Sequence, residues 1–150
     1  MSDLPRVLFL CTGNSCRSQM AEGWARQLHG GVLDPASAGI ETHGLNPNAV
    51  AVMKESGVDI SGHRSQTLAD FADAEGNPPR WDLVVTVCGH ADETCPALPG
   101  VTRKVHVGFD DPPKLAQGET DPERALDHYR RVRDEIRTFV ETLPVLLAEG

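Results

Sequence analysis

A cysteine and an arginine six positions apart, Cys11 and Arg17, stand between an apolar run and a segment with helical periodicity. The run at residues 7–10 is typical of a buried parallel strand. The segment after Arg17 places apolar residues one turn apart on one side, which predicts a helix; these residues are Met20, Trp24 and Leu28. The pattern therefore predicts a short loop that joins a strand to the start of a helix.

Such a loop is suited to binding an oxyanion. Backbone N–H groups in the loop and in the first helical turn are unpaired and carry partial positive charge. Arg17 adds a planar fork for two anion oxygens, and the same donors stabilise a Cys11 thiolate, which makes it a nucleophile. Ser18 can hydrogen-bond the sulfur. A structural cysteine beside a solvated arginine would have the same bare spacing, but strand, loop and helix in register favour an oxyanion-binding loop, made of Thr12, Gly13, Asn14, Ser15, Cys16, Arg17 and Ser18.

The loop resembles that of low-molecular-weight tyrosine phosphatases. The segments CTGNSCRSQMAEGW, SAGIETHG, DLVVTVC and GFDDP are similar to those of the thioredoxin-coupled arsenate reductases built on that phosphatase fold. The similarity runs nearly from end to end. It implies an α/β fold with a single open, parallel, four-stranded sheet flanked by helices on both faces.

The composition predicts one domain over residues 1–150, with a proper core. The chain carries a net charge of −8, which tells against nucleic acid and anionic membranes as partners. No apolar run approaches the roughly 20 residues of a membrane helix, and the N-terminus lacks a signal peptide pattern. We therefore expect a cytoplasmic protein, in which four cysteines indicate redox or metal chemistry rather than structural disulfides.

The predicted elements alternate between strand and helix, which indicates a parallel sheet covered on both faces. Strands are expected at 7–10, 36–38, 83–87 and, near a sheet edge, 101–107. Helices are expected from the anion loop to Gly30, from Asn46-Pro47 to Gly57 with Val50 and Met53 facing inward, and briefly at 68–72 within a polar loop. The apolar stripe at 125–143 predicts a long final helix that starts at Asp121-Pro122 and is ended or kinked by Pro144.

The chain order brings three reactive side chains to one edge of the sheet. Cys11, Cys88 and Asp111 each follow a predicted strand directly or within a few residues. In open parallel sheets, ligands bind beyond the carboxyl ends of the strands. We therefore expect these three residues to converge at one site.

Cys88 and Cys95 form a second candidate thiol pair. Their spacing is unusual for zinc, and two buried small residues are the structural alternative. If residues 88–95 were helical, the two Cα atoms would lie about 10 Å apart, whereas a disulfide needs about 7 Å or less. Forming the bond would unwind the segment, which Gly89 and Pro96 favour. The resemblance implies a redox switch that presents this disulfide to a carrier.

Displacing an oxygen from an oxyanion requires a proton donor, and a loop aspartate can supply it. Asp110 and Asp111 compete for this role, with a solvated turn as the alternative; in the family pattern the acid directly precedes proline, which favours Asp111. We interpret Cys16 as a packing residue that is liable to oxidation to Cys11. His43 and His63 lie in family-like segments behind the site, and we assign neither to catalysis.

The resemblance also raises the question of a cation. Some relatives hold potassium with residues that match Asn14, Glu22 and Ser37, plus an aspartate. Gln66 stands at the aspartate position and supplies less charge. We therefore expect no tightly bound cofactor and regard a potassium site as doubtful.

The resulting hypothesis is reduction of arsenate to arsenite in arsenic detoxification. Cys11 would attack arsenic, and a Cys11–Cys88–Cys95 relay would end in a disulfide that thioredoxin reduces. We expect a monomer, with phosphate or sulfate as mimics of arsenate. A tyrosine phosphatase is the first alternative, although aromatic residues make up only 5% of the chain. A non-enzymatic oxyanion or arsenic sensor is the second alternative, and no DNA-reading helix or basic patch supports it.

Overall fold

The four strands form one parallel sheet. The structure is a computed structural model that describes residues 4–76, 79–87 and 103–149. Strands β1 (Arg6–Cys11), β2 (Asp34–Gly39), β3 (Leu83–Thr86) and β4 (Lys104–His106) lie in the order β2-β1-β3-β4, and all pairs are parallel. The four-stranded parallel sheet is thereby confirmed, as is the edge position of β4. Residues 101 and 102 of the expected fourth strand lie outside the described residues.

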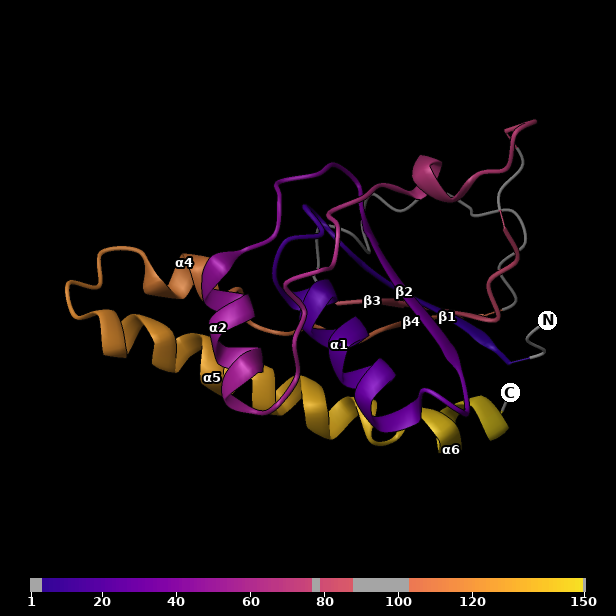
Figure 1. The fold of residues 1–150 in the computed structure, drawn as a ribbon. Coiled ribbons are helices and arrows are strands. Elements are labelled where there is room, and N and C mark those ends of the chain that lie inside the picture. Colours follow the sequence, from indigo (N-terminus) through magenta and orange to yellow (C-terminus); the bar gives the residue numbers. More distant parts are fainter. Residues whose placement is uncertain (1–3, 77–78, 88–102, 150) are drawn as a thin grey trace.

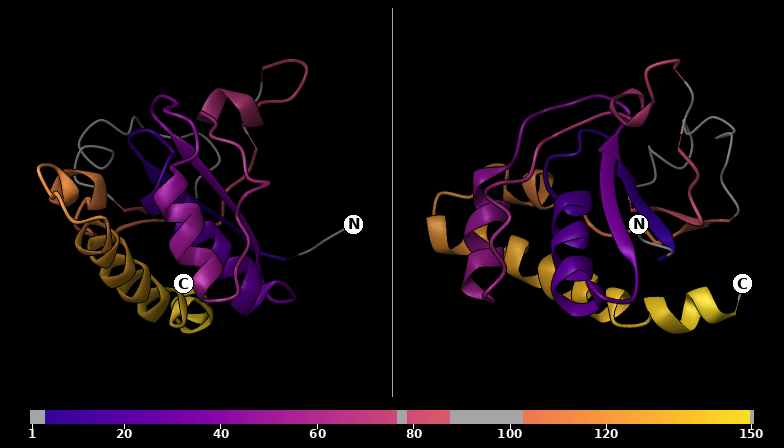
Figure 2. Two further views of the ribbon diagram at one scale, coloured as in Figure 1. Left: turned by 60° about the vertical axis from the view of Figure 1, so that its left-hand side comes forward. Right: turned by 45° about the vertical axis from the view of Figure 1, so that its right-hand side comes forward.

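Most of the described helices gather on one side of this sheet. They are α1 (Arg17–His29), α2 (Pro47–Glu55), α4 (Pro112–Ala116), α5 (Pro122–Val140) and α6 (Leu143–Ala148). Figure 1 shows α1 and α5 below the strands, α2 to their left, and the 3₁₀ turn η1 (Leu68–Phe71) above them; Figure 2 shows the same arrangement from two other directions. Helices α1, α2 and α5 pack against one another.

Helix α5 packs through the apolar stripe that the sequence predicts. Tyr129, Val132, Ile136 and Val140 are all buried against α1 and α2. The helix ends at Val140 rather than continuing to residue 143, and α6 begins at Leu143 with proline in its first turn. Proline lacks an N–H group and fits only in the first turn of a helix, so it starts a second helix instead of ending the first.

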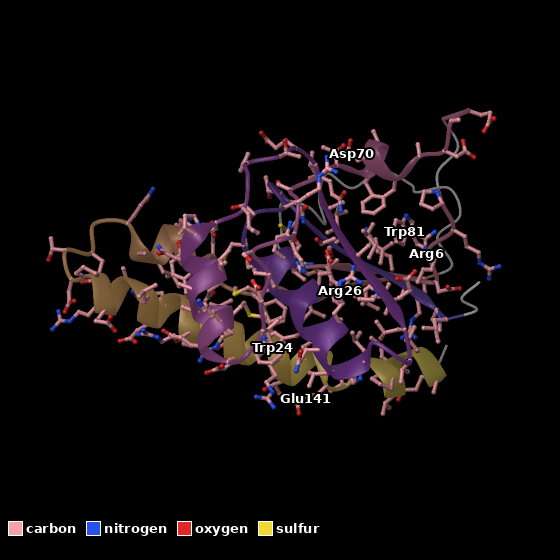
Figure 3. All side chains as sticks on the ribbon, in the orientation of Figure 1. Arg6, Trp24, Arg26, Asp70, Trp81 and Glu141 are labelled. Atoms are coloured by element: carbon pink, nitrogen blue, oxygen red, sulfur yellow. The ribbon has the colours of Figure 1, made fainter. Side chains whose placement is uncertain are left out.

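The other face of the sheet is covered by the segment that precedes β3. Trp81 is only 2% exposed, with the Phe71 ring edge-on at 5.3 Å between centroids. The Arg6 guanidinium lies 4.7 Å from the centroid of the Trp81 ring (Figure 3). The short helix expected near residues 68–72 is thus present as η1, and its aromatic neighbours cover apolar sheet surface.

Capping residues, proline and glycine define the ends of helices α2 and α4. Asn46 caps α2 by accepting from two backbone N–H groups, and Gly57 follows the helix with a φ of 81°, as expected. Met53 is buried, but Val50 is only half-buried, so the inward face is shifted from the predicted one. The short helix α4 was not predicted; Asp111 is its N-cap and Pro112 its first residue.

Among the described helices, none is long and apolar enough to span a membrane.

Candidate active site

A cavity of about 360 Å³ opens beyond the carboxyl end of β1. It brings Asp111 together with Cys11 and Arg17 of the anion loop. The convergence expected of Cys11, Cys88 and Asp111 is therefore seen for Cys11 and Asp111, while Cys88 and Cys95 lie outside the described residues. The full lining consists of Cys11, Thr12, Gly13, Ser15, Cys16, Arg17, His43, Asn46, Asp111 and Pro113.

The anion loop has its backbone carbonyls turned outward. Every carbonyl from Cys11 to Cys16 accepts a hydrogen bond from a donor outside the loop, at 2.9–3.2 Å. The donors are the backbone N–H groups of Ile40, Glu41, His43, Asn46 and Met20, the side-chain amide of Gln19 and, as a second donor to Gly13, the hydroxyl of Ser65. Because the N–H and C=O groups of a peptide unit point in opposite directions, this arrangement turns N–H groups towards the loop interior. The result is an anion-binding nest at the N-terminus of α1.

Four of these donors come from one segment, residues 40–46, which we call the strap. The strap runs beside the loop after β2 and is fastened to the carbonyls of Cys11, Thr12, Gly13 and Ser15. Gly39 allows the close approach, because a Cβ there would collide with backbone atoms of Glu41, Asn14 and Thr12. Sequence reasoning noted this segment only as part of the resemblance, because such pairing gives no periodic signal.

A chain of hydrogen bonds fixes the direction of the Ser18 hydroxyl. The backbone N–H of Gln66 donates to Asn14 Oδ1 at 2.8 Å, which identifies the other side-chain atom of Asn14 as its amide nitrogen. That nitrogen donates to Ser18 Oγ at 2.9 Å, and Ser18 Oγ lies 2.9 Å from Cys11 Sγ. Since Ser18 already accepts from Asn14, its proton is free to point to the sulfur, where it stabilises a thiolate. Asn14 has a φ of 48°, in the left-handed region that asparagine tolerates better than most residues.

Gln19 and His63 support this chain from behind. The Gln19 amide nitrogen donates to the backbone and side-chain oxygens of Asn14 and to the carbonyl of Arg64. Its oxygen lies 3.0 Å from His63 Nδ1. His63 does not line the cavity, so the structure places it behind the loop, where the sequence suggested it. The position of Gln19 on the buried side of α1 was missed, because its polar side chain interrupts the helical pattern of apolar residues.

Cys16 is buried in the loop, with 6% of its surface exposed. Burial, followed by the negative charge of the neighbouring Cys11, raises the pKa of the Cys16 thiol far above its usual range. The side chain therefore stays a neutral thiol near pH 7, in keeping with a packing role rather than a nucleophilic one.

Asp111 and Asp110 point to different neighbours. Asp111 lines the cavity, and its carboxylate lies 3.7 Å from the Arg17 guanidinium. The Asp110 carboxylate instead accepts from Arg131 on α5 at 2.9 Å. Arg17 also donates to the carbonyl of Phe109 at 2.9 Å. This bond connects the segment that carries Asp110 and Asp111, which we call the acid-bearing loop, to the anion loop. This geometry supports Asp111 over Asp110 as the proton donor.

The residues of the suspected potassium site already satisfy one another. Glu22 is 6% exposed, and its carboxylate accepts from Ser37 at 2.6 Å and from Arg26 at 2.9 Å; Figure 3 labels Arg26 beside β2. The Asn14 side-chain oxygen accepts from Gln66 and Gln19. Since a guanidinium supplies the positive charge and the oxygens are engaged, this group of residues does not fit a potassium ion. Among the described residues, no cluster of three or more His, Cys, Asp or Glu side chains could hold a metal.

Comparison with known proteins identifies close relatives. A family model described as low molecular weight phosphotyrosine protein phosphatase matches residues 6–149. The chain is 54% identical to the arsenate reductase of Halalkalibacterium halodurans and 51% identical to that of Bacillus subtilis strain 168; each match covers 91% of this chain and 95% of the relative. A solved structure described as an arsenate reductase in the phosphate binding state is 33% identical, with a TM-score of 0.68, and covers 96% of this chain and 99% of that one.

Proposed function

Because the chain belongs to the low molecular weight phosphotyrosine protein phosphatase family, we propose that it uses the oxyanion chemistry of that fold to reduce arsenate to arsenite. The observation that carries the proposal is the 54% identity to an arsenate reductase over nearly the whole of both chains. The geometry agrees with it, since Cys11, Arg17 and Asp111 line one cavity. The biological role would be arsenic detoxification.

Arsenate binds in the nest of the anion loop. The backbone N–H groups bond its oxygens, and the Arg17 fork bonds two of them. A net charge of −8 for the chain opposes long-range attraction of an anion, so binding depends on these local donors. Since phosphate has the same tetrahedral shape, the phosphate-binding state of a 33% identical arsenate reductase supports this assignment, and sulfate should also mimic the substrate.

Cys11 then acts as the nucleophile. Its thiolate attacks arsenic, an arsenic–oxygen bond breaks, and Asp111 gives a proton to the departing oxygen, which leaves as water. The Ser18 hydroxyl, 2.9 Å from the sulfur, stabilises the attacking thiolate. The product of this step is a cysteine–arsenate ester in which arsenic is still pentavalent.

A relay of thiols supplies the electrons. The Cys88 thiolate attacks the Cys11 sulfur, the sulfur–arsenic bond breaks, and its electron pair stays on arsenic, which leaves as trivalent arsenite. Cys95 then attacks Cys88, which frees Cys11 and forms a Cys88–Cys95 disulfide. The dithiol of thioredoxin reduces that bond. The sequence supports this order, because a helix over residues 88–95 would have to unwind to form the bond, and the disulfide would then be exposed when it forms.

The thiol chemistry also bears on the compartment, the oligomeric state and the cofactors that we propose for the enzyme. Three cysteines that cycle between thiol and disulfide, beside a fourth that stays a thiol, suit a cytoplasmic, reducing compartment. We propose a monomer with no tightly bound cofactor, since thiols and thioredoxin supply all the electrons. Potassium has no part in the proposal, because Arg26 supplies the positive charge beside Glu22.

Dephosphorylation of aryl phosphates is the competing activity, since Cys11, Arg17 and Asp111 suffice for it. Among the described residues, the cavity lining includes no Phe, Tyr or Trp side chain, and phosphotyrosine recognition needs aromatic or apolar walls. We therefore expect phosphatase activity only as a weak by-product of the shared loop. A sensor that binds arsenic without turnover is distinguished by stoichiometric retention of arsenic with no arsenite released.

The test is arsenite production with purified thioredoxin, thioredoxin reductase and NADPH. We expect sustained turnover for the wild type and none for Cys11→Ser. Cys95→Ser should give at most one turnover, because the first disulfide would form but could not pass to the surface. Cys16→Ala is the matched control and should keep turning over. Sustained turnover by Cys95→Ser would contradict the relay, and phosphate release from an aryl phosphate that exceeds arsenite production in the wild type would favour the phosphatase.

A further inference from the structure

His43 lies on the wall of the anion cavity. Its side chain is half exposed and is one of the cavity-lining residues. Arg17 is the only other lining side chain among the described residues that can carry positive charge. The mechanism above gives His43 no role, so its position calls for a physical account.

One backbone contact and two ring contacts hold His43 in place. The backbone N–H of His43 donates to the carbonyl of Gly13 at 3.0 Å, which fixes the strap against the loop. Ring atom Nε2 lies 3.0 Å from a carboxylate oxygen of Glu41. The ring also fills the space above Gly13, because a Cβ at that position would collide with Nδ1, Cγ and Cε1 of the imidazole. The absence of a side chain at Gly13 therefore makes room for this ring.

These contacts decide where each proton of the ring resides. Since a carboxylate only accepts hydrogen bonds, Nε2 keeps its proton and donates it to Glu41. A neutral ring then has its lone pair on Nδ1, the ring atom nearest to the place that a Cβ on Gly13 of the anion loop would occupy. The second proton binds at Nδ1, where it replaces a lone pair with a donor and adds positive charge beside the loop.

We propose that His43 is an oxyanion-binding residue whose protonation strengthens the binding of doubly charged tetrahedral anions in the Cys11 cavity. The inference rests on the anion-binding part of the proposed function and adds to it a specificity-determining residue from the strap. It concerns binding and not the relay, so it holds for arsenate, phosphate and sulfate alike.

Other charged side chains line or adjoin the same cavity, and the test must distinguish their effects on anion binding from the effect of His43. Glu41 lies beside the ring on the strap; Cys11 and Cys16 belong to the loop, Arg17 to α1, and Asp111 to the acid-bearing loop. Arginine stays charged throughout, carboxylates are ordinarily ionised above about pH 5.5, and Cys16 stays a thiol. Replacing Cys11 by serine removes its charge, so His43 is then the only cavity-lining side chain among the described residues whose type ordinarily changes charge between about pH 5.5 and 8.

The experiment measures sulfate binding by calorimetry in a Cys11→Ser background between about pH 5.5 and 8. Sulfate keeps its double charge throughout that range, so any change in affinity comes from the protein. We expect the dissociation constant to rise roughly fivefold with pH, the size of one partly solvated charged hydrogen bond. Adding His43→Gln should remove most of this rise by weakening binding at low pH, and His43→Lys should keep tight binding at pH 8.

His128→Gln is the matched control. His128 also faces a glutamate, with Nε2 at 3.9 Å from Glu119, but it does not line the cavity, so its variant should follow the parent. A rise with pH that persists in His43→Gln, or a parent affinity that is independent of pH, would overturn the inference. A parent that binds no sulfate at any pH would instead overturn the anion site of the proposed function.

Discussion

Replacing Ser18 by alanine should shift Cys11 from thiolate towards thiol. Ser18 is fully buried, and its oxygen lies 2.9 Å from the Cys11 sulfur and 2.9 Å from the Asn14 amide nitrogen that directs the hydroxyl proton. A hydrogen bond to a charged group contributes about 1.5–3 kcal/mol. Cys11 is 4% exposed, so water replaces little of the loss. The ratio of thiolate to thiol at a given pH should fall about 10- to 100-fold, since each 1.4 kcal/mol is roughly tenfold.

The assay follows thiolate absorbance in the ultraviolet as a function of pH, in a Cys88→Ser/Cys95→Ser background. Cys16 stays silent because burial raises the pKa of its thiol. Alkylation by iodoacetamide at pH 7 should slow by a smaller factor, about 3- to 10-fold, because a less stabilised thiolate is a stronger nucleophile. Mass spectrometry identifies Cys11 as the alkylated residue.

Ser15→Ala is the control, because Ser15 lies in the same loop and lines the cavity, while its backbone carbonyl holds the strap. Removing its hydroxyl should leave the Cys11 thiolate ratio within about twofold of the parent. If Ser18→Ala also stays within twofold, the directed hydrogen bond does not stabilise the thiolate and the reasoning fails. Urea unfolding should show a loss of about 1–3 kcal/mol for Ser18→Ala, since the buried Asn14 amide loses its acceptor.

Further predictions concern two contacts near the site and one ion-pair cluster between α2 and α5. Gly13→Ala should destabilise the fold by about 1–3 kcal/mol in urea unfolding because its Cβ would collide with the His43 ring, and adding His43→Ala should recover most of that loss; equal losses in both backgrounds would exclude the collision. Hydrogen bonds from two α5 arginines lower the pKa of Glu55, so Glu55→Gln should cost at most about 1 kcal/mol at pH 7, and the cost should vanish as the pH falls below about 4.3 and through the lowered folded pKa. Exchanging KCl for NaCl should leave the thermal midpoint unchanged, because Arg26 supplies the charge beside Glu22; a rise specific to potassium would contradict this.

Much of the fold could be predicted because local signals agreed with long-range ones. The apolar run of β1, the capping residue Asn46 and the stripe of α5 each define an element from its own sequence. Parallel strands then bring Cys11 and Asp111 to one edge of the sheet without knowledge of any contact. The sequence predicted that Pro144 would end or kink the last helix, and the structure has a break two residues earlier, with Pro144 in the first turn of α6.

The backbone pairing of the strap and the partners of the buried Glu22 side chain could not be predicted in the same way. Residues 40–46 bond the anion loop through their backbone, and backbone pairing in an irregular segment depends on no particular side chain. The choice of Arg26 as the partner of Glu22 needs the three-dimensional position of β2, since Arg26 also donates to the Pro35 carbonyl. Helix α4 has only five residues, too few for a periodic signal.

These contacts together explain how a chain of strong negative charge can hold an anion beside a thiolate. The strap, Gln19 and the first turn of α1 draw every loop carbonyl outward, so the peptide dipoles around the anion are fixed before it arrives. Arg17 meanwhile contacts the carbonyl of Phe109 and the carboxylate of Asp111. An anion that recruits the Arg17 fork therefore competes with Asp111 for it, and a carboxyl that is relieved of its cationic partner beside a negative substrate holds a proton more readily. Substrate binding would in this way prepare the acid for the step that needs it.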